Sequence, residues 1–451
     1  MQAGSRLHRK IQKKMGSTYH AEVPLNIIIE EENYELGIWG RADGIIIEET
    51  VTIDEIKGVY LSLDLLEEPV KVHLAQAKCY AYIYGIQNDL QKINVQMTYG
   101  NLDTGDLKYF SYEYSMQQLQ EWFSDLILKY KKWADFQYEW RKKRQASIKE
   151  LAFPFPYREG QKELAAGVYR TIARKKNLFI QAPTGVGKTI STLYPAIKAV
   201  GEGLGDKIFY LTAKTVTANV AKETLGILCE KGYRAKSVQI TAKEKLCPCE
   251  EVDCNPVSCP YAKGHFDRVN DAVYELWTTE EVYSREVIRA HAEKWQVCPF
   301  EMCLDLSIWV DGIICDYNYV FDPNVHLKRF FGENISGDYI FLIDEAHNLV
   351  ERGREMYSAG ISRQSLVALR KKIRKRFSKL ARTLDKANRQ MMELEENLAE
   401  TGKGYQVLPN PGVLPITFLT ISGELEEILE EKELEEELLE EELLLCASCS
   451  A

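Results

Sequence analysis

The sequence lacks two features that mark exported and membrane-bound chains. No apolar run in its 451 residues approaches the ~20 residues that a membrane-spanning helix requires. No secretory hydrophobic segment follows the N-terminus either. We therefore expect a cytoplasmic protein without a membrane partner. A chain of this length has room for about two to four domains, each with its own core.

The sequence also lacks a strong charge excess outside one C-terminal segment. The total formal charge is −10, but residues 423–445 hold twelve Glu and one Lys, a local charge of −11. Removing that segment from the total leaves +1, so basic patches on the rest of the chain can act locally on a polyanion. Leu residues at helical spacing within the segment predict an acidic helical tail, which either packs on a partner helix or stays solvated.

Cysteines are plentiful, but the cluster between the two nucleotide motifs lacks the paired Cys-x-x-Cys knuckles usual for structural zinc. The chain has eleven cysteines, and Cys247, Cys249, Cys254 and Cys259 fall within thirteen residues, with Cys298 following. In a chain that looks cytosolic, such density argues against disulfides and favours metal or cluster ligation. Four thiolates suit an iron–sulfur cube, and a four-cysteine zinc site is the alternative.

The stretch QAPTGVGKT, residues 181–189, predicts a phosphate-binding loop. It follows the apolar run 177–180, which predicts a strand, and precedes a helical pattern at 190–200. A strand, a glycine-rich loop and a helix N-terminus form a cradle of backbone N–H groups for phosphate. Lys188 would add a positive charge, and the Thr189 hydroxyl would reach Mg²⁺. The predicted nucleotide-binding residues of the loop are Ala182, Pro183, Thr184, Gly185, Val186, Gly187, Lys188 and Thr189.

A second nucleotide motif ends the apolar pattern at 339–343, which predicts a buried parallel strand. The residues that follow are Asp344, Glu345, Ala346 and His347. At the carboxyl end of such a strand, Asp344 would hold Mg²⁺ and Glu345 would orient or deprotonate the attacking water. We place His347 at the same site. The two motifs together predict an ATPase core.

The N-terminal region predicts a strand meander that carries carboxylates. Alternating β-branched runs lie at 22–29, 40–47 and 51–57. Along a strand side chains alternate, so Glu55 and Lys57 share one face. Asp43 on one strand and the Glu55–Lys57 pair on the next form an acidic pocket that can hold Mg²⁺ or Mn²⁺. A solvated Glu/Lys pair on a surface hairpin is the alternative, and Asp54 competes with Glu55 for the metal-facing position.

Four pieces of this region stand in an order that resembles the RecB-like branch of PD-(D/E)XK nucleases. They are Gly4-x-x-x-His8, Gly40-Arg-Ala-Asp43, Glu55-x-Lys57 and, on a helical pattern at 73–84, Gln76-x-x-x-Tyr80. The resemblance implies that His8, Asp43 and Glu55 bind metal. Lys57 would position the nucleophile or transition state. Gln76 and Tyr80 would shape the site and contact DNA.

The nucleotide motifs and the cysteine insert between them resemble the XPD/DinG family of iron–sulfur superfamily 2 helicases. The resemblance implies a 4Fe-4S cluster that wedges the duplex fork and is held by Cys247, Cys254, Cys259 and Cys298. Cys249 is a spare that can replace Cys247 or Cys254. Gln161, after the Phe/Pro-rich run that begins at Phe153, resembles the adenine-reading element of these enzymes. An ordinary helix start is the alternative for Gln161.

These patterns predict an α/β fold in which a nuclease domain precedes a RecA-like helicase domain. The expected segments are a nuclease domain at 1–146, a first RecA-like part at 147–245, an iron–sulfur insert at 246–303, a second RecA-like part at 304–355, a partial helical arch at 356–422 and an acidic tail at 423–451. No second set of RecA-like strands is recognisable after residue 399, so we expect a fragment or a separate polypeptide that supplies the second half.

The resemblance implies an ATP-dependent DNA helicase, 5′ to 3′ in polarity, with a fused Mg²⁺- or Mn²⁺-dependent DNA nuclease. Its substrate would be single-stranded or forked DNA in repair or recombination. Two other functions fit the same residues. One is a metal-dependent DNA exonuclease whose motor is idle. The other is an iron–sulfur DNA-binding protein that grips junctions without unwinding.

Overall fold

The computed structural model describes residues 2–60, 62–102, 104–183, 185–332 and 335–430. The chain divides into two compact units, residues 1–139 and residues 140 onward. The division falls within the long helix α3 (Met116–Glu150), whereas the sequence placed the end of the first domain at residue 146. From residue 431 the expected acidic tail lies outside the described residues.

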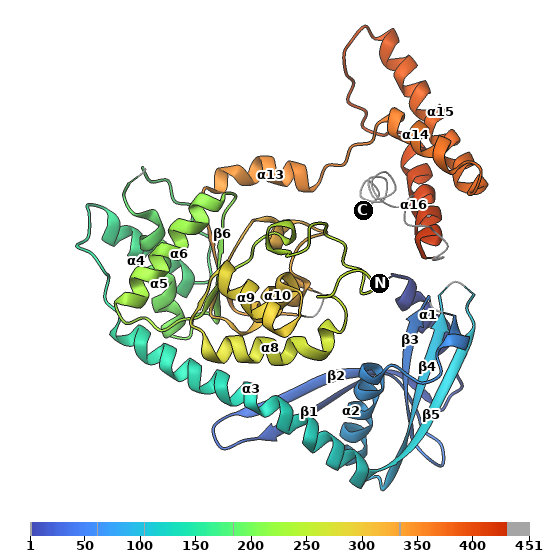
Figure 1. Ribbon diagram of the computed structural model, residues 1–451, viewed down its shortest axis with the longest axis horizontal. Coiled ribbons are helices and arrows are strands. Elements are labelled where there is room, and N and C mark those ends of the chain that lie inside the picture. Colours follow the sequence, from blue (N-terminus) through green and yellow to red (C-terminus); the bar gives the residue numbers. More distant parts are fainter. Residues whose placement is uncertain (1, 61, 103, 184, 333–334, 431–451) are drawn as a thin grey trace. The chain divides into compact units, whose positions relative to one another are not determined.

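The first unit is built on a five-stranded sheet in the order β1-β2-β3-β4-β5 (Figure 1). Its strands are β1 (Tyr19–Glu30), β2 (Glu35–Ile46), β3 (Thr52–Val59), β4 (Lys92–Asn101) and β5 (Leu107–Ser115). The three predicted strands are confirmed as an antiparallel meander. β3 and β4 pair in parallel, and helix α2 (Lys71–Gln87) makes the crossover between them.

The core of the first unit determines where α2 presents its polar residues. Ala77 and Ala81 are fully buried against the sheet, where Val95 and Met97 of β4 are also buried. Small side chains let the helix approach the strands closely, and burying each large apolar side chain contributes about 1.5–3 kcal/mol. Gln76 and Tyr80 each precede one of these alanines, so the packing holds both of them at the flank of α2.

The second unit contains a parallel sheet in the order β10-β6-β9-β7-β8. Its strands are β6 (Lys207–Leu211), β7 (Ser237–Gln239), β8 (Val282–Tyr283), β9 (Gly312–Cys315) and β10 (Tyr339–Ile343). The helices that bear on the site are α4 (Gln161–Ala173), α5 (Lys188–Gly201), α6 (Thr215–Glu230), α7 (Lys243–Leu246), α8 (His265–Thr279), α9 (Arg285–Trp295) and α10 (Pro299–Trp309). The parallel sheet with its helices confirms the mixed α/β class.

Two strand predictions near the nucleotide motifs need correction. Residues 177–183 are irregular chain rather than a strand, and the Phe179 side chain is 92% exposed. β10 is an edge strand rather than a buried one, since Phe341 and Ile343 are exposed and only Ile340 is buried. A parallel strand is buried only where neighbours cover it on both sides. Within the described residues, the outer edge of β10 carries no paired strand.

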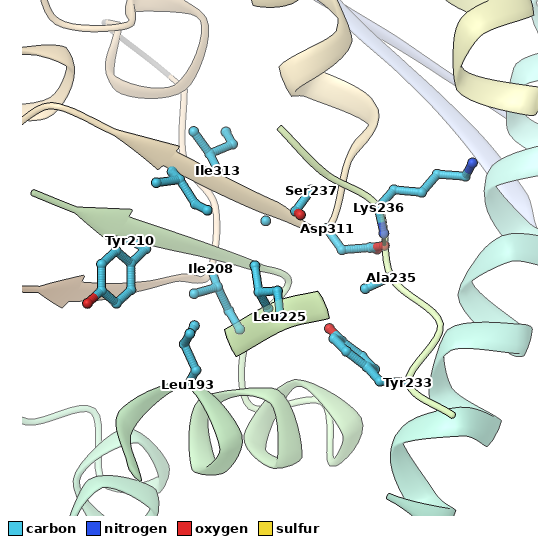
Figure 2. A pocket seen from close by; sticks show the side chains of 12 residues that line it. Leu193, Ile208, Tyr210, Leu225, Tyr233, Ala235, Lys236, Ser237, Asp311 and Ile313 are labelled. Atoms are coloured by element: carbon cyan, nitrogen blue, oxygen red, sulfur yellow. Dashed lines mark hydrogen bonds between the residues drawn. The ribbon is translucent and has the colours of Figure 1, made fainter. Parts of the chain in front are cut away.

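A small cavity of about 20 Å³ lies between this sheet and helices α5 and α6 (Figure 2). Leu193, Ile208 and Ile313 line it on the apolar side, with Tyr233 and Lys236 nearby. A space of this size holds about one water molecule. It is therefore a packing defect of the core, and a nucleotide must bind elsewhere.

The C-terminal described helices form a module of their own. They are α14 (Arg363–Ile373), α15 (Ser378–Glu400) and α16 (Leu414–Glu430), and they follow α13 (Leu349–Met356). Leu369, Leu384 and Leu425 are buried among them. Helices are therefore present in the segment 356–422, for which the sequence predicted a partial helical arch; the arch itself stays a prediction. None of the described helices has both the length and the apolar character needed to cross a bilayer.

A buried ion pair ties α3 to the second sheet. Arg144 Nη1 lies 2.6 Å from Asp311 Oδ1, and both side chains are less than a tenth exposed. The other Asp311 oxygen accepts hydrogen bonds from the Trp140 indole and the Lys236 backbone N–H, each at 2.8 Å. Removing one partner of a buried pair leaves an uncompensated charge.

We expect Arg144→Ala to lower the free energy of unfolding by about 3–5 kcal/mol, because Asp311 would keep its buried charge without the guanidinium. Thermal and denaturant unfolding measure this loss. The control is Arg141→Ala, since Arg141 is 58% exposed and 3.9 Å from Asp206. Its loss should stay below about 1 kcal/mol. Equal losses in the two variants would contradict the burial argument.

Candidate metal centre and nucleotide site

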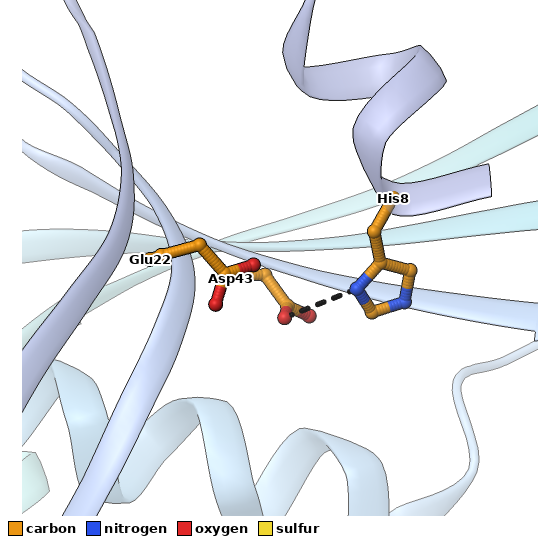
Figure 3. A group of neighbouring side chains, drawn as sticks. All are labelled: His8, Glu22 and Asp43. Atoms are coloured by element: carbon orange, nitrogen blue, oxygen red, sulfur yellow. Dashed lines mark ion pairs between the residues drawn. The ribbon is translucent and has the colours of Figure 1, made fainter. Parts of the chain in front are cut away.

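The first candidate site lies where helix α1 (Gln2–Gln12) meets strands β2 and β3. His8 Nδ1 of α1 is 3.3 Å from Asp43 Oδ1 of β2 (Figure 3). This contact with the carboxylate raises the pKa of His8. The second Asp43 oxygen accepts a hydrogen bond of 2.8 Å from the Ile56 backbone N–H of β3. Asp43 is therefore oriented by both neighbours.

A chain of hydrogen bonds extends from β3 to α2. Lys57 Nζ donates to Glu55 Oε1 at 2.8 Å and to Gln76 Oε1 at 3.1 Å. Gln76 Nε2 in turn donates to the Tyr80 hydroxyl at 3.1 Å. The structure thus brings together every residue predicted for this site, which are His8, Asp43, Glu55, Lys57, Gln76 and Tyr80.

Asp54, the competing carboxylate, points to the other face of β3. Its oxygens accept hydrogen bonds from the Tyr19 hydroxyl at 3.0 Å and from Gln96 Nε2 at 3.1 Å. The side chain is fully buried, and this burial raises its pKa. Because its oxygens already have partners, Asp54 acts as a structural residue of the sheet. Glu55 is the carboxylate that faces the site.

Glu55 carries the clearest sign that a cation fits here. Its side chain is almost completely buried, and its Oε2 atom has no hydrogen-bond partner among the described residues. Burial and the nearby Asp43 charge, opposed by Lys57, raise the pKa of Glu55 to about 7. Leaving a buried acceptor unsatisfied costs about 1–3 kcal/mol. A divalent cation would satisfy this oxygen, and carboxylate oxygens are the ligands that Mg²⁺ and Mn²⁺ prefer.

One neighbour of the site was missed from the sequence. Glu22 of β1 offers a carboxylate oxygen that lies, with one ligand atom each of His8 and Asp43, in a group within 4.8 Å (Figure 3). β1 and β2 pair so that Ala21 faces Gly44 and Val23 faces Ala42, which sets Glu22 across from Asp43. No spacing in the sequence marks Glu22, because the contact depends on the register of two strands.

The second candidate site surrounds the N-terminus of α5. Gly185 and Gly187 have φ angles of +86° and +77°, in the left-handed region that favours glycine. A Cβ on Gly187 would lie 2.7 Å from Gln161 Nε2. Lys188, the first residue of α5, places Nζ 3.3 Å from Glu345 Oε1. The two predicted nucleotide motifs therefore meet, although Thr184 lies outside the described residues.

Gln161 supports the phosphate loop through hydrogen bonds. It is 5% exposed, its Nε2 donates to the Val186 carbonyl at 3.1 Å, and its Oε1 accepts from the Arg158 backbone N–H at 3.0 Å. Both ends of the amide are engaged, so in this structure Gln161 holds the loop. Ala182 and Pro183 lead into that loop as irregular chain.

The second nucleotide motif, residues 344–347, lies at the carboxyl end of β10 and is called the acidic motif below. The Asp344 backbone N–H donates to the Leu211 carbonyl of β6 at 2.9 Å, and the Tyr317 hydroxyl donates to the Asp344 carbonyl. Glu345 has a φ of +51°, a left-handed value that is uncommon for a side chain of its kind. This turn directs its carboxylate to Lys188, while the exposed His347 lies 3.5 Å from the other Glu345 oxygen.

In the cysteine insert, Cys247 directly follows helix α7, and other thiols of the insert lie near Cys247 and near Lys243 of the same helix. Burial and the neighbouring Cys259 and Cys247 thiols raise the pKa of Cys249 to about 11. Lys243 of α7 contacts the Cys254 thiol and lies close enough to Cys298 for their charges to interact. Cys303 and Cys315 are buried instead in α10 and β9. The five ligand candidates are Cys247, Cys249, Cys254, Cys259 and Cys298.

The sulfurs of the insert do not form a ready zinc tetrahedron. With a Zn–S distance of about 2.3 Å, four ligands stand about 3.8 Å apart. Among the described residues, no three cysteine sulfurs fall within 4.8 Å of one another. The chemistry of these thiols fits either an iron–sulfur cube or a four-cysteine zinc site.

Comparison with known proteins identifies one region of the second unit. Residues 216–366 match the DEAD_2 family. The chain is 26% identical over 180 residues to the Fanconi anemia group J protein homolog of Gallus gallus, covering 36% of this chain and 14% of the relative. It is 23% identical over 309 residues to the general transcription and DNA repair factor IIH helicase subunit XPD of Arabidopsis thaliana, covering 59% and 40%.

Among solved structures, one described as truncated XPD is 20% identical and covers 51% of this chain and 65% of its own, with a TM-score of 0.38. The chain spans less than half the length of the curated relatives named above. Taken together, the family match and the relatives support a relationship to XPD-like superfamily 2 helicases. The matched family segment lies within the second unit.

Proposed function

We propose that the chain is the ATP-binding part of an XPD/DinG-type DNA helicase joined to a metal-dependent DNA nuclease. The observation that carries the motor half is the meeting of Lys188 and Glu345, 3.3 Å apart, from motifs that lie far apart in the sequence. Forked DNA in repair or recombination is the proposed substrate, and 5′ to 3′ is the proposed polarity.

In the motor, each residue has a separate task. The backbone N–H groups that precede α5 hold the phosphates, and Lys188 neutralises their charge. Glu345 orients the attacking water, with Asp344 as the ligand of a nucleotide-bound Mg²⁺. Lys188 pairs with Glu345 in this structure, so a bound phosphate would have to draw the ammonium away before Glu345 can reach the water.

The direct test of the motor is ATP hydrolysis with and without single-stranded DNA, followed by separation of a forked duplex. DNA-stimulated hydrolysis together with strand separation supports a helicase. Hydrolysis or DNA release without strand separation supports the junction-binding alternative instead. A second polypeptide with the other RecA-like half is a proposed partner, since the outer edge of β10 is open within the described residues.

The cysteine insert is proposed to hold a 4Fe-4S cluster. The two cysteines near Lys243 support this proposal, because a cluster with thiolate ligands carries negative charge that an ammonium stabilises. Cys249 lies beside Cys247 and Cys259, so it stays a candidate to replace Cys247 or Cys254 as a ligand.

Cys298→Ser is expected to remove the visible absorbance of protein purified without oxygen, because one of four iron ligands is lost. Iron and sulfide analysis should fall from about four of each per chain toward zero. Cys303→Ser is the control, since Cys303 is buried in α10 apart from the insert thiols. Colour retained in Cys298→Ser would place the ligand elsewhere, and one zinc without colour would favour a zinc site.

For the nuclease half, a divalent cation at Asp43 and Glu55 would polarise the scissile phosphate and activate water. Glu55 and Asp43 hold it, and His8 restrains Asp43 through the contact of 3.3 Å. Lys57 is held by Glu55 and Gln76 within reach of the same space, where its ammonium stabilises charge that develops on the phosphate. Gln76 and Tyr80 are proposed to contact DNA.

One observation favours the alternative of an exonuclease with an idle motor. The segment 177–183 that leads into the phosphate loop is irregular and exposed at Phe179, so the loop lacks the strand that normally anchors it. Metal-dependent DNA cleavage by a chain that does not hydrolyse ATP would support that alternative. Hydrolysis of ATP would exclude it.

Mn²⁺ binding to the full chain without nucleotide is expected to weaken as the pH falls through 7. The pKa of Glu55 is about 7, so below that pH the carboxyl must release a proton before it can bind the cation. His8, whose pKa is also raised, adds a second proton to displace. The affinity should fall at least tenfold per pH unit below 7 and level off above 8. Calorimetric titrations between pH 5.5 and 8.5 measure it, and a constant affinity would contradict the assignment.

A further inference from the structure

The hairpin of β1 and β2 carries a row of exposed side chains on its outer face, and the row leads to Asp43 (Figure 1). The inner face of the hairpin packs on the core through Leu25 and Ile38. Arg41 and Trp39 lie two and four residues before Asp43 along β2, and both are exposed. Residues two apart on a strand share a face and are about 7 Å apart. Arg41 and Trp39 therefore extend in line from the candidate metal centre.

The Trp39 indole is held flat over Gly37. Trp39 Cη2 lies 1.9 Å, and Cζ3 2.4 Å, from the position that a Cβ on Gly37 would occupy, so only glycine leaves room for the ring. Trp39 is nevertheless 71% exposed. The ring thus covers the strand with one face and leaves the opposite face to solvent. A side chain that is already ordered loses little freedom when a second ring stacks on it.

Arg41 places a positive charge between Trp39 and the metal centre. Its side chain is 63% exposed, and Nη1 lies 3.6 Å from a Glu22 carboxylate oxygen that is itself about half exposed. A pair of exposed charges is worth little, so a phosphate can replace Glu22 as the partner of the guanidinium. Across the hairpin, Arg41 and Trp39 face Pro24 and Asn26, neither of which is acidic.

Positive charge is also present on helix α1, which contacts the other side of Asp43 through His8. The helix contains Arg6, Arg9 and Lys10 and has no Asp or Glu. Its buried leucine and isoleucine, at positions 7 and 11, pack against β3. An elongated polyanion that crosses the metal centre would therefore meet positive charge on both sides of it.

We propose that Trp39 and Arg41 form a track for single-stranded DNA that leads to the metal centre, with a base stacked on Trp39 and a phosphate bound by Arg41. This inference rests on the proposed nuclease function and names the substrate class of that site. A single strand offers a free face of every base, whatever its sequence, whereas a duplex keeps its bases stacked on one another. The row ends at carboxylates suited to phosphate chemistry, which favours DNA over a protein partner for the exposed indole.

The test is Mn²⁺-dependent cleavage of a fluorescent single-stranded oligothymidylate by the full chain without ATP. Trp39→Leu should raise KM about ten- to hundredfold, the loss expected for one stacked base, and leave kcat nearly unchanged. Trp39→Phe keeps an aromatic face and should recover most of the affinity. Gly37→Ala should also raise KM, because it displaces the ring without removing it. The control is Tyr109→Ala, which should not change KM, since Tyr109 is a 49% exposed aromatic residue on β5 of the same sheet.

Ultraviolet crosslinking to a bromouracil-containing single strand, without divalent cations, gives a second measurement that needs no cleavage. Mass spectrometry of the digested product should locate the crosslink at Trp39. Cleavage by the wild-type chain with an unchanged KM in Trp39→Leu and no crosslink at Trp39 would overturn the track, leave the nuclease function intact and favour a protein partner. A crosslink at Trp39 without any cleavage would support the track and refute the nuclease function. Neither cleavage nor crosslink would refute both.

Discussion

Lys188→Ala should lower ATP turnover by about 10²–10³-fold, because it removes the Lys188 ammonium that lies at the phosphate loop. Lys188 begins α5 directly after the left-handed Gly187, and its Nζ is 3.3 Å from Glu345. No other described lysine is paired with the acidic motif. The loss should appear as reduced phosphate release and as weaker nucleotide binding.

The matched control for this variant is Lys222→Ala, because Lys222 is an exposed lysine on helix α6. Both variants lose one charge from the same unit, so a general effect of charge would appear in both. Turnover should remain near the wild-type value in Lys222→Ala. Unchanged nucleotide affinity in Lys188→Ala would contradict the proposed site and favour an idle motor.

At the motor site, the features that depend on neighbouring residues could be predicted from the sequence, and the pairing of strands could not. The phosphate loop, α5 and the acidic motif were predictable because each depends on a few neighbouring residues, such as the left-handed glycines 185 and 187. Pairing of strands is not local. The run 177–180 has the composition of a strand, but a strand exists only where another strand accepts its hydrogen bonds. For the same reason β10 was expected to be buried and is an edge strand instead.

The residues of the metal centre also fall into those that local sequence predicted and those that it did not. The alternation of side chains along β3 was sufficient to place Glu55 with Lys57 on one face. The choice between Glu55 and Asp54 stayed open until the structure showed the Asp54 oxygens bound to Tyr19 and Gln96 on the other face. The i, i+4 spacing was sufficient to join Gln76 with Tyr80. Glu22 could not be predicted, because its place beside Asp43 depends on the register of β1 on β2. Gln12 could not be predicted either, because its hydrogen bond to the Asp43 carbonyl depends on the docking of α1. Among the cysteines, density marked the insert, but only the fold set Cys249 beside Cys247 and Cys259.

Asp43→Asn should abolish Mn²⁺-dependent DNA cleavage, with a loss of about 10³-fold or more. Asp43 contacts His8 and its charge acts on Glu55, and the amide would remove that charge while keeping the shape of the side chain. A thousandfold loss corresponds to about 4 kcal/mol of transition-state stabilisation. Asp106→Asn is the control, because Asp106 lies exposed in the turn between β4 and β5 and should leave cleavage unchanged.

ATP turnover by the same variant decides whether the two activities are separate. Asp43 belongs to the first unit and Lys188 to the second, and each site is built from residues of one unit only. Asp43→Asn should therefore hydrolyse ATP normally, and Lys188→Ala should still cleave single-stranded DNA without ATP. If Asp43→Asn also lost ATP turnover while remaining folded, the two units would be coupled. If its cleavage stayed at the wild-type level, the carboxylates of β2 and β3 would be structural and the first unit would need another function.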